Sequence, residues 1–233
     1  MTDQLKKIPY HLGIIMDGNR RWAKQKGLPT LEGHFRGYKK IGEVGEWCRK
    51  KGIKILTLWT FSTENWHRSQ KEVDYLMKLL EMALSKREIN KLSKKGIKLR
   101  IIGQKERFSE KLQRLIKEAE EATKNNKEAT LVLAMSYGGR AEIIEAVQKI
   151  INKKNTVGKI TEETINENLW TAGLPDPDLI LRTGEELRVS GFLTWQSVYA
   201  ELYFLKKYWP EFSEKDLDII LADYANRERR WGR

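Results

Sequence analysis

The stretch IIMDGNRRWA, residues 14–23, places one carboxylate, one glycine and two guanidinium groups directly after a short apolar run. The carboxylate of Asp17 is a hard oxygen ligand of the kind that Mg²⁺ takes, and Mg²⁺ completes its shell with phosphate oxygens and water. Gly18 allows a turn that other residues resist, and a helix beginning at Asn19 would point unpaired N–H groups at an anion. These residues predict either a site for a metal ion and an anionic group or an ordinary capped helix start with Asp17 as its N-terminal acid.

The segment FSTENWHR, residues 61–68, gathers hydroxyl, amide, indole and guanidinium groups behind a second apolar run. Its amide and guanidinium groups are suited to binding phosphate or positioning a substrate, and an exposed Trp66 would offer a flat apolar wall. Alternatively, Ser62 or Thr63 caps a short helix and Trp66 lies in the core. The segment is a second candidate for an anion-binding loop.

A third cluster, LILRTGEELRVSG, extends from residue 179 to residue 191. Arg182 ends an apolar run, and Arg188 and Ser190 follow a turn, so two guanidinium groups and a hydroxyl could converge on one phosphorylated group. Taken singly, surface arginines more often have no specific role. Glu201, just before the apolar run LYFL, is by itself an acid at the edge of a strand.

The composition indicates the class of partner without naming it. There are 44 Lys and Arg residues against 32 Asp and Glu residues, a formal net charge of +12, which fits nucleic acid, phosphorylated metabolites or anionic lipid headgroups. The sequence contains no dinucleotide-binding or Walker A glycine loop and no G-x-S-x-G elbow. One cysteine, Cys48, and three histidines argue against an internal disulfide and a zinc site. Without a signal peptide or a long apolar run, the chain is expected to be soluble and cytoplasmic.

Short aliphatic runs alternate with longer amphipathic segments along the chain. The runs predict strands at residues 11–16, 54–61, 97–102, 130–136, 178–182 and 202–205. The amphipathic segments predict helices near residues 33–50, 71–94, 108–124, 138–153, 162–170 and 214–229. This alternation predicts an α/β fold in one domain, residues 1–233, with a largely parallel sheet of about six strands and helices on both faces. The polar clusters follow strands, and ligands in such folds collect at the carboxyl ends of the strands.

The predicted helix 71–94 carries apolar residues at helical spacing, namely Val73, Leu76, Met77, Leu80 and Leu84. They form either the wall of an apolar tunnel or an ordinary core face. Residues 69–72, which precede this helix, are expected to form a flexible lid.

Taken together, these segments resemble the cis-prenyltransferase family, whose members include undecaprenyl diphosphate synthase. The resemblance covers nearly the whole chain, in the family's order, through HLGIIMDGNRRWA, EGH, LTLWTFSTENWHRS, LAMSYGGRAEI, LPDPDLILRTGEELRVSGFLTWQSVYAELYF, WPEF and ANRERRWGR. It implies an undecaprenyl diphosphate synthase-like fold. It also implies cis condensation of isopentenyl diphosphate with an allylic diphosphate to a (poly)cis-prenyl diphosphate, a precursor of lipid carriers for glycan or cell-wall synthesis.

The resemblance implies a role for each matching residue. Asp17 would bind Mg²⁺ and act in catalysis, and Glu201 would be a second Mg²⁺ ligand. Asn65 occupies the position of the family pattern to which removal of the proton is often assigned. Contacts with the allylic diphosphate would come from Gly18, Asn19, Arg20, Arg21, Trp22, His34, Ser62, Thr63 and Glu64. The remaining substrate contacts would come from Trp66 and Arg68 and, at the isopentenyl diphosphate site, from Arg182, Arg188, Val189 and Ser190. The family also implies a homodimer, in which Arg230 and Gly232 reach toward the partner's active site, and membrane contact for product release.

Several residues depart from the family pattern. Arg20 stands where glycine is common, and Thr30 replaces a diphosphate-binding arginine, so Arg20 is expected to compensate for Thr30. Glu185, Leu187 and Ser136 replace a glycine, a polar residue and an asparagine. No essential group is lost, and the set leans toward archaeal-like or divergent members.

Two other functions fit parts of the sequence. The net charge and eight tryptophans would suit a basic RNA- or DNA-binding protein, although no nucleic-acid-binding module is recognisable. A non-catalytic partner of an active prenyltransferase would share the resemblance, but the retention of Asp17, Asn65, Arg182, Arg188 and Glu201 argues against it.

The amide of Asn65 is not titratable near neutral pH. It is therefore expected to orient the isopentenyl group, while water or a diphosphate oxygen accepts the proton.

Overall fold

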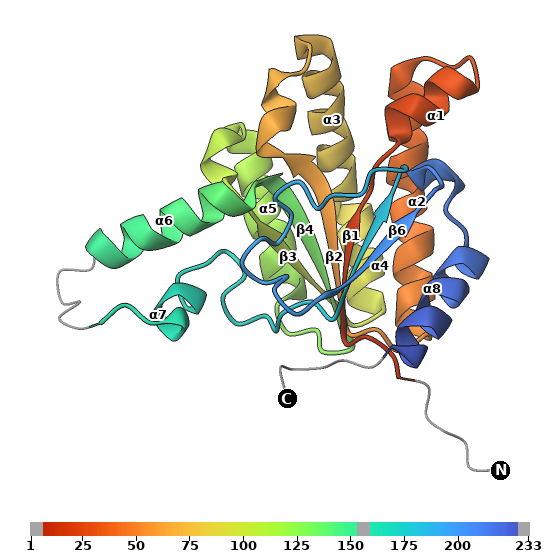
Figure 1. Cartoon of the computed structure of the whole chain (residues 1–233). Helices are drawn as coiled ribbons and strands as arrows, with labels where there is room; N and C mark the ends of the chain where they lie inside the picture. The colour runs from red at the N-terminus through yellow and green to blue at the C-terminus, as the bar shows by residue number, and fades with distance from the viewer. Residues whose placement is uncertain (1–6, 153–158, 228–233) are drawn as a thin grey trace.

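Six parallel strands form one sheet in the order β3-β4-β2-β1-β5-β6, in a computed structural model that describes residues 7–152 and 159–227 (Figure 1). The strands are β1 (His11–Ile15), β2 (Ile55–Ser62), β3 (Ile97–Ile102), β4 (Ala129–Tyr137), β5 (Leu179–Thr183) and β6 (Glu201–Leu205). Each predicted strand agrees with an observed one to within one residue at either end. The agreement follows from near-continuous apolarity: β1 and β5 are buried at every position, as strands covered on both faces must be.

The helices are α1 (Asn19–Gln25), α2 (Thr30–Lys50), α3 (Gln70–Ala83), α4 (Lys86–Lys94), α5 (Glu110–Thr123), α6 (Gly139–Asn152), α7 (Glu162–Asn166) and α8 (Glu214–Asn226), with 3-10 turns η1 (Thr63–His67), η2 (Lys105–Arg107) and η3 (Trp209–Glu211). The prediction of one helix over 71–94 is wrong. Leu84 ends α3, and Ser85 is extended and precedes α4 as its N-cap residue. The last helix is also shorter than predicted, because Arg227 is extended.

The two faces of the sheet are covered differently. On one face, Leu12 and Ile14 of β1 belong to a core cluster with residues of α2, α3, α4, α5 and α8. On the other face, Ile180 of β5 packs with Phe192 and Leu193 of the irregular segment that follows it, and α6 and α7 share a smaller cluster. The expected helices on both faces are thus only partly observed, because much of the second face is covered by chain without regular structure (Figure 1).

The carboxyl end of the sheet carries the loop that begins α1. Gly18 has φ +99°, and a Cβ atom on it would lie 2.5 Å from the ring of Tyr208. A side chain is therefore excluded both by the backbone conformation and by packing. The N–H of the fully buried Trp209 donates to the carbonyl of Asp17 at 3.0 Å, which fixes the loop from the other side.

None of the helices in the described part of the chain combines the length and apolarity required to cross a bilayer.

Candidate active site

Asp17 lies between two guanidinium groups at the ends of β1 and β5. Its Oδ2 accepts hydrogen bonds from Arg182 at 2.7 Å and forms an ion pair with Arg21 at 3.0 Å. Its Oδ1 accepts from the N–H of Gly18 at 2.6 Å, and its own N–H donates to the Thr183 hydroxyl at 3.0 Å. Gly18, not Asp17, is the N-cap of α1. The interpretation of Asp17 as an ordinary helix cap is therefore wrong.

Arg182 connects this carboxylate to the third cluster. Its side chain is 7% exposed, and its Nη1 donates to the Ser190 hydroxyl at 2.8 Å and to the Arg188 carbonyl at 2.5 Å. The Arg188 guanidinium instead turns outward, with 61% of the side chain exposed. Val189 packs beside the apolar cluster of the second sheet face. Arg182 and Ser190 thus converge as predicted, whereas Arg188 joins them through its main chain only.

Glu186 was missed in the sequence. Its carboxylate accepts from Arg21 at 3.3 Å and from Arg188 at 2.5 Å, so it joins the α1 loop to the loop after β5. The available signal was its position between basic residues in RTGEELR. Two arginines that the resemblance places in different substrate sites are therefore held by one acid.

Glu72 was also missed, and it organises the second cluster. Its Oε1 accepts from His34 at 2.9 Å and from Arg68 at 3.0 Å, and the Arg20 guanidinium lies 4.0 Å away. Glu72 is buried in the first turn of α3, and Ser69 is the N-cap residue of that helix. The prediction of a flexible lid at 69–72 is therefore wrong. The i,i+4 spacing of Arg68 and Glu72 was the signal that identifies the pair.

Burial and neighbouring charges shift the pKa values of His34 and Glu72. Burial lowers the pKa of His34 below its ordinary value, in spite of the hydrogen bond to Glu72. Burial by itself raises the pKa of Glu72, but the His34 hydrogen bond and the charges of Arg68 and Arg20 outweigh it, so the pKa is lowered. His34 is therefore neutral at neutral pH, and its Nε2–H must be the donor, because the ionised carboxylate of Glu72 only accepts.

The segment after β2 forms η1, with mixed consequences for the predicted contacts. The Asn65 amide oxygen accepts from the N–H of Ser62 at 3.1 Å in a capping box, and Asn65 lines the cavity described below. Trp66 instead packs against Phe61 with ring centroids 4.9 Å apart, and its indole N–H donates to Ser136 at 2.9 Å. The prediction that Trp66 forms an exposed substrate wall is wrong, because its ring lies against the core.

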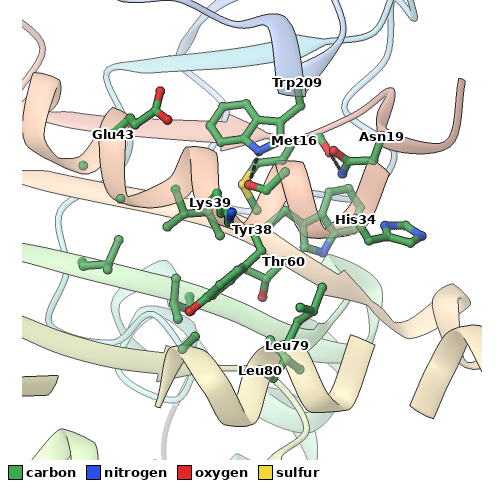
Figure 2. A pocket seen from close by; sticks show the side chains of 18 of the residues that line it. Met16, Asn19, His34, Tyr38, Lys39, Glu43, Thr60, Leu79, Leu80 and Trp209 are labelled. Atoms are coloured by element: carbon green, nitrogen blue, oxygen red, sulfur yellow. Dashed lines mark hydrogen bonds between the residues drawn. The ribbon is translucent and has the colours of Figure 1, made fainter. Parts of the chain in front are cut away.

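A cavity of about 1240 Å³ extends from the α1 loop along the helical face of the sheet. Figure 2 shows Leu79 and Leu80 on one side and Met16 and Trp209 on the other, with His34 and Glu43 toward opposite ends. The polar residues near its Asp17 end include Asp17, Gly18, Asn19, Arg20, Arg21, His34, Asn65 and Arg68. The cavity walls do not include Trp22, Ser62, Thr63 or Glu64.

The predicted tunnel face of α3 is only half correct. Leu76 and Leu80 line the cavity, together with Leu79. Val73 and Leu84 are buried, and Met77 packs against the core cluster, but none of these three lines the cavity. The helix face that was predicted as one stripe is therefore divided between cavity wall and core.

Glu201 lies at the wrong end of the sheet to share an ion with Asp17 of the same chain. It is the first residue of β6 and pairs with Leu179, which pairs with Leu12 of β1. β1 ends at Ile15, about 10 Å beyond Leu12 in the strand direction, and Asp17 follows that end. Glu201 instead forms an ion pair with Arg227 at 2.9 Å. Within one chain the two carboxylates therefore do not meet, and the role of Glu201 as a second Mg²⁺ ligand stays a prediction. Arg230 and Gly232 lie outside the described residues.

The carboxylate of Asp17 fits a hard cation that takes most of its oxygen ligands from a bound phosphate group and water. Across residues 7–152 and 159–227, no group of three or more His, Cys, Asp or Glu side chains could hold a metal ion. Mg²⁺ does not need such a group, because one or two carboxylates suffice when phosphate oxygens and waters complete the shell. The carboxylate of Asp17 is 28% exposed and so can be reached from the cavity.

The departures from the family pattern have local structural consequences. Glu185 has φ +71° and Ser136 has φ +49°, a region that favours glycine or asparagine. Thr30 is the first residue of α2 and lines the cavity, as Arg20 does. Leu187 is 75% exposed. Glu185 and Ser136 therefore hold strained conformations at the carboxyl end of the sheet.

Comparisons with known proteins identify the family of the chain. A family model described as "Putative undecaprenyl diphosphate synthase" matches residues 15–232. The isoprenyl transferase of Thermotoga maritima is 46% identical, with 97% of each chain covered. That of Neisseria gonorrhoeae is 45% identical, with 97% of this chain and 90% of the relative covered.

Solved structures are similar over almost the whole length. Lavandulyl diphosphate synthase from Lavandula x intermedia, crystallised with dimethylallyl diphosphate, has a TM-score of 0.92 and 38% identity, covering 97% of this chain and 99% of its own. A probable undecaprenyl diphosphate synthase from Campylobacter jejuni has a TM-score of 0.82 and 35% identity, covering 97% and 100%. These similarities confirm the predicted fold and do not favour the nucleic-acid-binding or non-catalytic alternatives. The chain belongs to the undecaprenyl diphosphate synthase family of isoprenyl transferases.

Proposed function

We propose that this chain condenses isopentenyl diphosphate with an allylic diphosphate in the cis configuration. The product is a (poly)cis-prenyl diphosphate, a precursor of lipid carriers for glycan or cell-wall synthesis. The observation that carries the proposal is the Asp17–Arg182 contact of 2.7 Å beside an apolar-walled cavity of about 1240 Å³. The guanidinium groups on either side of Asp17 can each bind a diphosphate, and the apolar walls of the cavity can hold a hydrocarbon chain. The dimethylallyl diphosphate in the Lavandula structure supports an allylic substrate.

The allylic diphosphate occupies the mouth of the cavity in this proposal. Asp17 would hold Mg²⁺, which, when bound, would supply charge neutralisation at the departing diphosphate. Arg20, Arg21 and Arg68 line the cavity there and stabilise the negative charge that grows as the allylic C–O bond breaks. His34 and Glu72 keep Arg68 in place through the shared carboxylate oxygen.

Isopentenyl diphosphate binds at the Arg182 side of the same carboxylate. Arg182 and Ser190 hold its diphosphate, and Arg188 exchanges its contact with Glu186 for the substrate. Because Arg182 contacts Asp17 directly, the two diphosphates lie next to each other and the reacting carbons are held together. Such positioning supplies a large share of the rate in a reaction between two bound molecules.

Asn65 orients the isopentenyl group during proton loss. Its amide oxygen is engaged by the Ser62 N–H, which leaves the NH₂ end to face a substrate. An amide is a poor base, so the proton passes to water or to a diphosphate oxygen after the new carbon–carbon bond forms.

A homodimer fits the apolar surface beside the edge strand β6. Val198, Tyr199 and Leu202 are 73%, 60% and 40% exposed there, which is the kind of surface that a second copy covers. An apolar product also requires contact with a membrane surface for its release.

The test is a single incubation series. Purified protein receives Mg²⁺, labelled isopentenyl diphosphate and allylic primers of several lengths, and the products are identified by mass. The proposal predicts incorporation into products that are longer than the primer by whole five-carbon units. Salt-dependent binding of RNA or DNA without any incorporation would refute it.

A further inference from the structure

Strands β2 and β4 each contain one residue without a partner in the other strand near their carboxyl ends. The paired residues there are Trp59 with Ala134, Phe61 with Met135, and Ser62 with Tyr137. Thr60 of β2 and Ser136 of β4 are therefore left out of the pairing, and the two interruptions cancel each other. Interruptions of this kind often lie beside active sites, where they change the direction of a side chain or loop.

Ser136 is held in a conformation that serine rarely adopts. It is fully buried, and its φ of +49° lies in the left-handed region, which disfavours every residue with a Cβ atom. Its carbonyl accepts from the N–H of Gln104 at 3.1 Å, and its hydroxyl accepts from the indole N–H of Trp66 at 2.9 Å. The contacts around Ser136 thus maintain a strained residue, as is common at functional sites.

The contact with Ser136 fixes η1, which carries Trp66. η1 is a 3-10 helix of only five residues, and such helices have poor internal hydrogen-bond geometry. Its orientation is therefore determined by the groups that it contacts. The Trp66 ring lies edge-on against Phe61, with centroids 4.9 Å apart. Together with the hydrogen bond to Ser136, this packing ties η1 to the carboxyl ends of β2 and β4.

Asn65 precedes Trp66 in η1 and lines the cavity. Its amide oxygen accepts from the N–H of Ser62 at 3.1 Å, so the amide cannot turn independently of the helix. A displacement of Trp66 would therefore move the NH₂ group of Asn65 relative to a bound substrate. A displacement of about 1 Å in a group that orients reacting atoms can cost about 100-fold in rate.

We propose that Ser136 is a positioning residue for the condensation: its hydroxyl holds Trp66, and through η1 it holds the Asn65 amide against the isopentenyl group. The inference rests on the proposed function. It goes further by assigning a part in the reaction to a buried residue that does not line the cavity. It also gives Trp66 an anchoring role in place of the expected substrate wall.

The test removes the hydroxyl with Ser136→Gly. Glycine adopts a φ of +49° without strain, so the backbone is kept while the Trp66 indole loses its acceptor. With Mg²⁺, isopentenyl diphosphate and a short allylic primer, kcat should fall by about tenfold. The KM values for both diphosphates should stay within about twofold of the parent, because the arginines that bind them are not displaced.

Thr123→Val is the matched control for lost stability. The Thr123 hydroxyl is also fully buried, and on α5 it accepts from the N–H of Leu99 at 3.0 Å and donates to the Ala119 carbonyl at 2.9 Å. Valine should lower the unfolding temperature and leave kcat within about twofold of the parent. A kcat of Ser136→Gly equal to that of Thr123→Val would overturn the inference, and so would a rise in either KM without a fall in kcat.

Trp66→Phe tests the same hydrogen bond from its donor side, because it removes the indole N–H and keeps an aromatic ring. By itself it should also lower kcat by about tenfold at unchanged KM, which supplies a second test if Ser136→Gly fails to fold. The double variant should have a kcat within about twofold of Trp66→Phe, since one hydrogen bond can be lost only once. Losses that multiply would overturn the inference. A parent protein that incorporates no isopentenyl diphosphate would instead refute the proposed function itself.

Discussion

Replacing Glu72 by glutamine removes the negative charge that holds His34 and Arg68 in the active site. The carboxylate oxygen accepts two hydrogen bonds, at 2.9 and 3.0 Å, and the Glu72 side chain is only 10% exposed. Hydrogen bonds to charged groups contribute about 1.5–3 kcal/mol each. Glutamine keeps one acceptor oxygen, so the loss for Glu72→Gln is about 1–2 kcal/mol. Alanine removes both bonds and leaves the half-buried Arg68 without its partner, which costs about 2–3 kcal/mol.

The assay is urea unfolding followed by circular dichroism. With an m-value of about 2–3 kcal/mol per M, the midpoint should fall by roughly 0.5 M for Glu72→Gln and by about 1 M for Glu72→Ala. Asp74→Asn is the matched control, because Asp74 lies on the same helix and is exposed. A midpoint for Glu72→Ala equal to that of Asp74→Asn would refute the view that this carboxylate organises the cluster. Activity supplies a second readout: the KM for the allylic primer should rise for both Glu72 variants.

Two further predictions concern stability. Glu185→Gly should raise the unfolding free energy by about 0.5–1 kcal/mol, because Glu185 has φ +71° and a left-handed conformation costs an L residue about 1–2 kcal/mol. Thermal unfolding measures this change. The control Leu187→Gly, at a position without positive φ, should lower the unfolding free energy instead. Burial lowers the pKa of both His11 and His34. Below pH of about 6.5 the unfolded chain therefore binds protons that the folded chain does not, and the unfolding free energy should fall by up to ~1.4 kcal/mol per pH unit per histidine. The double variant His11→Gln/His34→Gln should show a flatter pH dependence of the urea midpoint, and an unchanged slope would contradict the assignment.

The strands could be predicted from the sequence because they are apolar on both faces. Asp17, Asn65 and Arg182 lie at or just after the carboxyl ends of parallel strands, so the sequence alone predicts that they meet at one end of the sheet. The helices were less predictable. The amphipathic pattern continues through Leu84 and Ser85, so periodicity did not reveal the break between α3 and α4.

The contacts of individual side chains could not be predicted from the sequence. Trp66 could face solvent or the core, and only the positions of Phe61 and Ser136 decide for the core. The i,i+4 spacing pairs Glu72 with Arg68, but the contact of Glu72 with His34 and that of Glu186 with Arg21 join distant segments and cannot be recognised until those segments are placed. Glu201 shows the converse: a motif identifies the residue, but its position at the start of β6 separates it from Asp17.

The central claim is that the carboxylate of Asp17 serves the chemistry and not the fold alone. Incorporation of labelled isopentenyl diphosphate into product by Asp17→Asn, at saturating Mg²⁺ and primer, tests it most directly, with Asp74→Asn as the control. Turnover should fall by about 100-fold or more in a variant that still unfolds cooperatively. Turnover equal to that of the control would contradict it.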